Sequence, residues 1–296
     1  MHPTHNLQPL VSIGVAVCNE ERFLSQTLDS LLAQDYSNFE IIICDNASTD
    51  KTGEIAQEYA KKDNRIKYYL NESNIGGTRN FNKTFLLSSG KYFMWAGGHD
   101  LYDKSFISSC VEILEKEENV ILVYALTHLI DNLNNKVGTW PNRLDTRSLN
   151  PLLRYHLFFY YLMKIHYIHG LMRRDSIKKT GLFKDNVLNS ENIFLSQLSL
   201  MGEFVYIPKF LFYYRIIRPK QTGWGNTTRY IKATYGQGHQ NYPYIFYILH
   251  QFYYNIIVIY KAPVAWYYKP ILVFILIFEF FLLRIRMAIK NSKHEQ

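Results

Sequence analysis

The stretch VSIGVAVCNEERFLSQTLDSLLAQDYSNFEIIICDNASTDKT, residues 11–52, decides the fold. Its two apolar runs, VSIGVAV (11–17) and FEIIICD (39–45), are short, rich in β-branched residues and bounded by polar turns, as buried parallel strands are. Between them, ERFLSQTLDSLLAQ (21–34) places its leucines on one helical face. The stretch therefore predicts a strand, a helix and a second strand parallel to the first.

The same alternation continues along the next part of the chain. GEIAQEYAKK (53–62) is typical of a helix, IKYYL (66–70) of a third strand and KYFMWA (91–96) of a fourth, with another helix between these two strands. Repeated units of this kind imply a parallel sheet covered by helices on both faces. We predict an α/β fold with a Rossmann-like, mainly parallel sheet, whereas residues 131–160 show no clear pattern.

Length and charge limit the possible functions. The 296 residues suit one large α/β domain with an appendage. A balance of 33 Lys and Arg against 25 Asp and Glu gives a net charge of +8, which favours an anionic partner such as a nucleotide or an acidic lipid surface. The chain contains no GxGxxG, GxxxxGK[ST] or GxSxG motif, which argues against a dinucleotide-binding enzyme, an NTPase and a serine hydrolase.

The cysteines and the N-terminal sequence indicate the cellular compartment of the protein. Cys18, Cys44 and Cys110 are widely spaced and form no CxxC pair, so neither a disulfide framework nor a structural zinc site is indicated and a reducing cytosol fits best. The first residues lack a basic region before the apolar run, so we expect no secretory signal. The C-terminal aromatic residues lie in apolar blocks rather than among Lys and Arg, so nucleic acid is not an expected partner.

Three polar clusters follow predicted strands, namely CNEE (18–21), DNASTD (45–50) and GGHD (97–100). In parallel sheets, ligands bind beyond the carboxyl ends of the strands, so we expect these clusters to converge on one crevice. Asp45 at such an end would accept hydrogen bonds from a nucleobase or ribose, although a purely structural turn is the alternative. Arg79, after a glycine pair at a helix start, suits a diphosphate, but a solvated surface arginine is equally compatible with the sequence.

The His99-Asp100 pair has two interpretations. Carboxylate oxygens suit a hard cation on a diphosphate, and imidazole suits softer divalent ions, so the pair is a candidate metal site. The alternative is that Asp100 only caps the helix that follows. Two adjacent residues do not decide between these interpretations.

The C-terminal third differs in character from the rest. Between Phe204 and Phe278 the chain contains no Asp or Glu, and two long apolar blocks occupy residues 244–260 and 271–285. Each block is shorter than the roughly 20 residues that a spanning helix needs, and the second contains Glu279. We therefore expect a pair of interfacial helices on an anionic membrane surface, with a helical hairpin packed on the main domain as the alternative.

Taken together, the opening stretch resembles family 2 glycosyltransferases with the GT-A fold. The resemblance covers about residues 10–218 and continues through five further segments, which are NIGGTRNFN (74–82), SGKYFMWAGGHD (89–100), HGLMRRDSIKKTGLF (169–183), SENIFLSQL (190–198) and YIPKFLFYYR (206–215). It implies a GT-A nucleotide-sugar-binding and catalytic domain over residues 1–218. Residues 219–296 then form a basic, aromatic helical region.

The resemblance also implies roles for individual residues. It places Asp45 at the uracil or ribose and Arg79 near the diphosphate. The whole set implied to contact the nucleotide-sugar is Ala16, Cys18, Glu20, Asp45, Arg79 and Asp100. His99 and Asp100 would hold a divalent metal, Mn²⁺ or Mg²⁺.

Three positions depart from the family pattern. Gly97-Gly98-His99-Asp100 replaces the usual Asp-x-Asp-Asp, and Cys18 replaces a tyrosine. The usual Glu-Asp pair reads Glu191-Asn192, and an asparagine cannot take up a proton. Glu191 is therefore the candidate catalytic base.

These expectations define a reaction class. We expect an inverting transfer of a sugar from a nucleotide-sugar, UDP-linked in our hypothesis, to a hydroxyl of a glycan or lipid-linked acceptor in surface polysaccharide synthesis. The enzyme would lie peripherally on the cytoplasmic face of the cell membrane. The altered acidic positions leave a non-catalytic nucleotide-sugar- or lipid-binding protein as the main alternative, and a nucleotidyltransferase as a further one.

Overall fold

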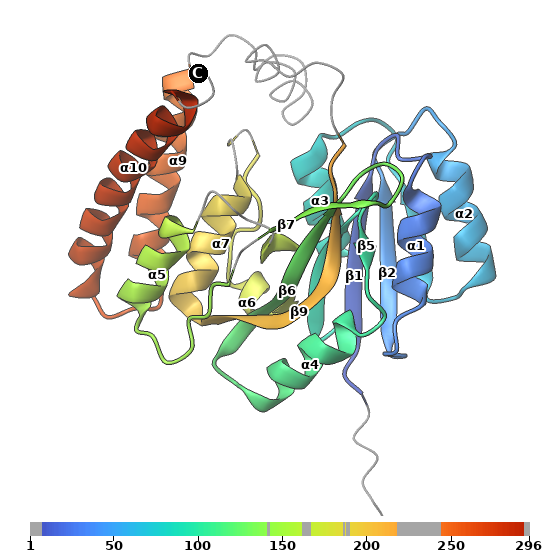
Figure 1. Cartoon of the computed structure of the whole chain (residues 1–296), viewed down its shortest axis with the longest axis horizontal. Coiled ribbons are helices and arrows are strands. Elements are labelled where there is room, and N and C mark those ends of the chain that lie inside the picture. Colours follow the sequence, from blue (N-terminus) through green and yellow to red (C-terminus); the bar gives the residue numbers. More distant parts are fainter. Residues whose placement is uncertain are drawn as a thin grey trace, which may run out of the picture.

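The structure is a computed structural model that describes residues 8–140, 143–161, 167–185, 187, 190–217 and 244–292. Within these residues a sheet of nine strands has the order β3-β2-β1-β4-β8-β6-β9-β5, and β7 pairs with β6 (Figure 1). The strands are β1 (Val11–Val17), β2 (Phe39–Asp45), β3 (Ile66–Leu70), β4 (Tyr92–Gly97), β5 (Leu101–Tyr102), β6 (Val120–Ile130), β7 (Lys136–Trp140), β8 (Leu171–Arg173) and β9 (Glu203–Arg215).

Helices cover both faces of this sheet. They are α1 (Leu24–Leu32), α2 (Thr52–Lys62), α3 (Gly77–Leu86), α4 (Phe106–Lys116), α5 (Pro151–Tyr160), α6 (Arg174–Lys178), α7 (Ser190–Met201), α9 (Tyr244–Lys261) and α10 (Tyr268–Ser292), with a short 3₁₀ turn η2 (Tyr167–His169). In α1 the leucines Leu24, Leu28 and Leu31 are fully buried, as their helical spacing predicts.

The N-terminal half has the predicted parallel arrangement. β1 pairs in parallel with β2 on one side and with β4 on the other, and β2 pairs in parallel with β3. The alternation of strands and helices in the sequence therefore corresponds to parallel strand-helix-strand units, and the predicted α/β fold with flanking helices is confirmed.

The C-terminal half makes the sheet mixed. β8 pairs antiparallel with β4 and β6, and β5 pairs antiparallel with β9, whereas β6 and β9 are parallel. Antiparallel neighbours need no crossover helix. For this reason the regular alternation of strands and helices in the first hundred residues does not predict the structure of residues 131–160. These residues include β7 and α5.

Two apolar clusters, one on each face of the sheet, form the core. One includes the leucines of α1 and the inner face of α4. The other contains Trp95, whose ring lies 4.7 Å from that of Phe183 and 5.4 Å from that of Phe194, centroid to centroid. Burying each of these aromatic side chains contributes roughly 2 kcal/mol, so this cluster fixes α7 against β4.

The two C-terminal helices form a hairpin at the end of the molecule opposite α2 (Figure 1). It packs on α5 and α7 through apolar residues and through two polar contacts. Ser196 donates to Asn255 at 2.9 Å, and Nδ1 of His156 lies 2.9 Å from a carboxylate oxygen of the buried Glu279. The predicted helices are therefore present, and one face of the hairpin contacts the main domain. Residues 219–243 of the predicted C-terminal region lie outside the described residues.

The opposite side of the hairpin, which we call its outer face, is apolar and exposed. It consists of Leu249, Tyr253, Tyr260, Trp266, Tyr267, Ile271, Phe274, Ile277, Phe278 and Phe281. Among the described helices, neither of these two nor any other combines the length and hydropathy required of a membrane span.

Candidate active site

The carboxyl ends of β1, β2 and β4 lie side by side. Val17 is in register with Asp45, and Ala16 is in register with both Cys44 and Gly97. The three polar clusters predicted to converge thus begin at neighbouring strand ends. We call residues 16–21, 45–50 and 97–100 the strand-end site.

Hydrogen bonds tie the loop after β1 to the loop after β2. The amide of Asn19 donates to Ser48 Oγ at 3.0 Å, and its side-chain oxygen accepts from the amide of Thr49 at 2.8 Å. The amide of Glu20 donates to Thr52 Oγ1 at 2.7 Å. Asn19 has φ 58°, a left-handed conformation that asparagine tolerates better than most residues. The two loops therefore form one unit.

Asp45 is buried beneath this unit, with 1% of its surface exposed. One carboxylate oxygen accepts from the amide of Ser48 at 2.9 Å and from its hydroxyl at 2.6 Å, and the other accepts from Tyr68 at 2.9 Å. Asp45 thus closes the turn, which was the structural alternative. A carboxylate has about four acceptor positions, so three bonds leave capacity for a ligand donor. Neighbouring Cys18 is largely exposed, but partial burial of its thiol and the charge of Asp45 raise its pKa.

An asparagine cluster, which the sequence reasoning did not single out, positions the start of α3. Asn71 donates to Asn46 at 3.2 Å and to Asn80 at 2.9 Å, and Asn80 donates to the carbonyl of Cys44 at 2.8 Å. These contacts place the first turn of α3 beside the end of β2. Three separate asparagines, far apart in sequence, give no recognisable motif.

Arg79 lies in that first turn of α3. Its side chain is 63% exposed and its Nε lies 2.6 Å from a carboxylate oxygen of Asp185. An exposed ion pair of this kind contributes little to stability, so an incoming anion can compete with Asp185 for the guanidinium. The positive end of the helix dipole favours the same anion.

The turn Gly97-Gly98-His99-Asp100 packs closely against β1. A Cβ atom on Gly98 would lie 2.9 Å from a methyl carbon of Val17 and 3.1 Å from Cγ of Glu20, so a side chain at this position would displace the turn. His99 Nδ1 lies 3.0 Å from a carboxylate oxygen of Glu20. Burial alone would lower the pKa of His99, but the bond to Glu20 and the negative charges of Asp100 and Glu20 raise it above its usual 6.5.

Arg215, at the end of β9, holds this turn in place. It is 1% exposed, its amide donates to Asp100 Oδ1 at 2.9 Å, and its guanidinium donates to the carbonyls of His99 at 2.8 Å and Asp131 at 2.7 Å. The guanidinium also lies 4.3 Å from the centroid of Phe23. The sequence reasoning assigned no role to Arg215, although it closes the quoted segment YIPKFLFYYR.

The turn has a partial fit to a divalent metal. Asp100 Oδ2 is buried with no hydrogen-bond partner among the described residues, and a Cβ on Gly97 would lie 2.6 Å from this oxygen and 3.8 Å from His99 Nε2. Because Gly97 has no side chain, a space remains beside Asp100 Oδ2 and His99 Nε2. No group of three or more His, Cys, Asp or Glu side chains in the described part of the chain is arranged to hold a metal, so most ligands would come from elsewhere. Asp100 does not cap α4, because that helix begins at Phe106.

Glu191 lies in the first turn of α7. Phe194, one turn later, packs on Trp95 of β4, and Ser190 accepts from the amide of Lys184, in the loop that carries Asp185. Burial raises the pKa of Glu191 above its usual 4.5, opposed in part by a bond from its own backbone. A carboxylate with a raised pKa is a better proton acceptor than an ordinary glutamate.

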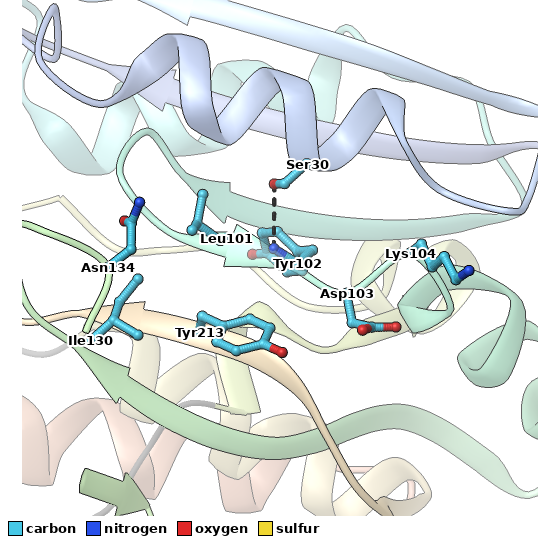
Figure 2. Close-up of a pocket in the computed structure, with 8 residues that line it drawn as sticks. All are labelled: Ser30, Leu101, Tyr102, Asp103, Lys104, Ile130, Asn134 and Tyr213. Carbon is cyan, nitrogen blue, oxygen red and sulfur yellow. Dashed lines mark hydrogen bonds between the residues drawn. The ribbon is translucent and has the colours of Figure 1, made fainter. Parts of the chain in front are cut away.

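A separate pocket begins one residue after Asp100. It has a volume of about 350 Å³ and lies between Ser30 of α1 and Tyr213 of β9, as Figure 2 shows. The amide of Tyr102 donates to Ser30 across it at 3.3 Å. None of its lining residues belongs to the strand-end site, so we do not assign the nucleotide to it.

The fold is that of the GT-A class, and comparison with known proteins gives the family. The model of glycosyl transferase family 2 matches residues 12–181, and the chain belongs to this family. An uncharacterised glycosyltransferase of Haemophilus influenzae is 30% identical over 216 residues, which cover 70% of this chain and 66% of the relative. The putative glycosyltransferase EpsE of Bacillus subtilis is 35% identical over 119 residues, covering 40% of this chain and 43% of EpsE.

Solved structures support the fold. Residues 1–349 of TarS from S. aureus in complex with UDP-GlcNAc match with a TM-score of 0.65 at 16% identity, covering 89% of this chain and 70% of that one. The mannosyltransferase PcManGT of Pyrobaculum calidifontis, with GDP-Man and Mn²⁺, matches with a TM-score of 0.59 at 16% identity over 91% and 70% of the two chains. The predicted GT-A fold is therefore confirmed. The chain spans 55–66% of the length of the first curated relatives.

Proposed function

We propose that this protein transfers a sugar from a UDP-sugar to a hydroxyl group of a glycan or lipid-linked acceptor in surface polysaccharide synthesis, with inversion at the anomeric carbon. The observation that carries the proposal is the junction of three strand ends, where Asp45, the start of α3 and the His99-Asp100 turn meet. The UDP complex and the UDP-GlcNAc complex of TarS, a protein with this fold, support the choice of nucleotide.

In the proposed reaction the acceptor oxygen attacks the anomeric carbon, the bond from that carbon to UDP breaks, and UDP leaves. Glu191 takes the proton of the acceptor hydroxyl, since its buried carboxylate has a raised pKa. Arg79 exchanges its contact with Asp185 for the diphosphate and balances the charge that develops there. Ala16, Cys18, Glu20 and Asp45 line the nucleotide end in this proposal.

The metal proposal concerns the other end of the diphosphate. We propose that His99 and Asp100 hold Mn²⁺ or Mg²⁺, with the remaining ligands supplied by the diphosphate and water. The unpartnered Oδ2 of Asp100 supports this assignment. A divalent ion in this position neutralises charge on the leaving group.

The alternative is a protein that binds nucleotide-sugars without turning them over, because Gly97 and Asn192 stand where acidic residues are usual. A panel of UDP- and GDP-sugars, assayed for hydrolysis and transfer with Mn²⁺ or with EDTA, decides between them. The proposal predicts release of UDP from at least one donor. Binding of UDP without release from any donor would favour the binding protein.

We also propose that the hairpin holds the enzyme on an anionic membrane surface at the cytoplasmic face. The outer face supports this, because its exposed residues are all apolar or aromatic, with Trp266 and Tyr267 at the turn and Lys261 and Lys269 close to them in sequence. The triple variant Trp266→Ser, Phe274→Ser, Phe281→Ser should abolish flotation with phosphatidylglycerol-containing vesicles. Leu86→Ser and Leu133→Ser, at exposed leucines elsewhere, provide the control. Unchanged flotation of the triple variant would refute the anchoring role.

A further inference from the structure

A second pocket lies where the hairpin meets the main domain. It has a volume of about 230 Å³ and is bounded by the loop after α6, by α7 and by the C-terminal half of α9. Its lining residues are Lys179, Thr180, Gly181, Leu182, Lys184, Ile193, Gln197, Tyr254, Ile257, Val258 and Lys261. We call it the lysine pocket.

The charge of the lysine pocket is entirely positive. Lys179 and Lys184 come from the loop after α6 and Lys261 from the end of α9, and no Asp or Glu lines the pocket. The ion pairs found among the described residues include neither Lys179 nor Lys261, and Lys184 donates to the carbonyl of Gly181 at 3.0 Å. None of these three lysines has a carboxylate partner among the described residues, so an anion bound in the pocket would be attracted by their positive charge.

The remaining walls of the lysine pocket are apolar. Ile193 and Val258 are buried at its base, and Tyr254 and Ile257 lie along the α9 side. Tyr253 and Tyr260 of the outer face belong to the same helix and are more than half exposed. A small inorganic anion would leave these apolar walls unused, whereas an anionic amphiphile can contact both the lysines and the adjoining apolar surface.

The lysine pocket is connected to the proposed catalytic residues. The loop that supplies Lys184 continues directly to Asp185, which pairs with Arg79 at 2.6 Å. Helix α7, which supplies Ile193 and Gln197, begins with the turn that holds Glu191. A ligand in the pocket therefore contacts both segments that carry the transfer residues.

We propose that the lysine pocket binds the phosphate group of a lipid, with the hydrocarbon chain lying on the outer face of the hairpin. The phosphate belongs either to a lipid-linked acceptor or to a headgroup of the bilayer. This inference deepens the proposed function. It rests on that function in one respect, because a lipid-linked acceptor is expected in the pocket only if the protein transfers a sugar. The binding of a lipid phosphate can be measured without any transfer.

The test uses the full-length protein and dihexanoyl phosphatidic acid in monomeric form, titrated by calorimetry. Lys179→Gln/Lys261→Gln should weaken binding about tenfold, because it removes two of the charges that face the phosphate. Lys178→Gln/Lys209→Gln is the matched control. It removes the same charge from two exposed lysines outside the pocket, one of them paired with Asp175 at 3.3 Å. Equal affinities of wild type and pocket variant, or equal weakening in the control, would overturn the proposal.

A vesicle experiment distinguishes the two sources of the phosphate. If bilayer headgroups occupy the pocket, Lys179→Gln/Lys261→Gln also loses flotation on mixed phosphatidylcholine and phosphatidylglycerol vesicles. If the phosphate belongs to the acceptor, flotation persists and only the binding of monomeric lipid falls. Titration of wild type with UDP in parallel keeps the two proposals separate, because a failure to bind UDP would refute the donor site while leaving the lysine result valid.

Discussion

The candidate active site has two halves that are built differently. We call the loops after β1 and β2 the nucleotide half, and Arg79, the His99-Asp100 turn and Glu191 the transfer half. In the loops after β1 and β2, polar side chains are bonded to one another, and the carboxylate of Asp45 alone accepts three hydrogen bonds. In the transfer half, Arg79 is exposed, and within the described part of the chain Oδ2 of Asp100 has no hydrogen-bond partner and the carboxylate of Glu191 has a bond from its own backbone. The nucleotide half is therefore already organised without ligand, while the transfer half keeps its reactive groups available.

This difference predicts that substitutions in the two halves act on different quantities. A change in the organised half should alter the affinity for UDP or the stability of the fold. A change among the available groups of the transfer half should alter turnover and leave the affinity for UDP and the stability of the fold nearly unchanged. The following variants test this division.

The largest effect is expected at Glu191. Glu191→Gln keeps the shape of the side chain but removes the proton acceptor, so kcat should fall about a thousandfold with unchanged affinity for UDP. Because burial raises the pKa of Glu191 above 4.5, the carboxylate becomes protonated at a higher pH than an ordinary glutamate. The acid limb of the kcat profile should therefore lie above pH 4.5. Steady-state kinetics over a pH series and calorimetry with UDP provide both readouts.

The neighbouring position provides a rescue experiment. Asn192→Asp in the Glu191→Gln background restores a carboxylate one residue away, about 100° around the helix. Recovery of turnover in this double variant would show that position 192 reaches the acceptor hydroxyl. Full turnover in Glu191→Gln alone would contradict the assignment and direct attention to Asp185 or Asp100.

A smaller effect, on stability, is expected at Arg215. Arg215→Met removes the donors to the carbonyls of His99 and Asp131 and also removes the positive charge that interacts with buried Asp100. The free energy of unfolding should fall by about 3 kcal/mol, as measured by urea denaturation. Arg215→Lys restores the charge but not the planar set of donors, so its loss should be intermediate. A fully stable Arg215→Met variant would show that the turn holds its own position.

A polar network outside the strand-end site gives a contrast. Glu40 accepts from Ser12 at 2.7 Å and from Ser89 at 2.8 Å, and lies 2.7 Å from the ammonium of Lys67. Burial would raise the pKa of Glu40, but these bonds lower it from 4.5 to about 2. The folded state thus has the lower pKa, so the stabilisation is complete above pH 4.5 and is lost as the pH falls towards about 2.

Glu40→Gln should accordingly cost about 2 kcal/mol at neutral pH and leave UDP affinity unchanged. The difference from wild type should shrink as the pH is lowered, because the wild-type carboxylate becomes protonated. Urea denaturation over a pH series measures this convergence. A difference that is constant with pH would mean that the charge of Glu40 contributes nothing to stability.

The smallest effect is expected at Asp45. Asp45→Asn preserves an acceptor for Ser48 but removes the negative charge, so affinity for UDP should fall about tenfold with little change in stability. Asp29→Asn is a matched control, because Asp29 also accepts from a tyrosine, Tyr59, at 2.7 Å but lies on α1. Equal UDP affinity of the two variants would restrict Asp45 to its role in the turn.

Much of the fold and part of the site could be predicted from the sequence. The spacing of apolar residues predicted β1, α1 and β2, because each of these elements buries one continuous pattern. It did not predict the pairing of β8 between β4 and β6, because a three-residue strand is too short to show a period. Convergence of the polar loops was predictable, since parallel strands end at the same edge of the sheet.

The roles of Arg215 and of the asparagine cluster were not predictable from the sequence. Arg215 acts through contacts with residues more than eighty positions away, including Asp131 and His99. The bonds among Asn46, Asn71 and Asn80 likewise depend on the approach of α3 to the end of β2. Such contacts follow from tertiary packing rather than from a local pattern.

The most direct test of the account is amide hydrogen exchange of the full-length protein with and without UDP. If the strand ends surround one nucleotide, UDP should slow exchange in the loops at 18–21, 45–50 and 97–100 and in the first turn of α3, all in the same titration. Exchange should be unaffected at Leu101–Tyr102 and around Ser30, which border the pocket of Figure 2. Protection confined to that pocket, with none at the three loops, would contradict the central claim.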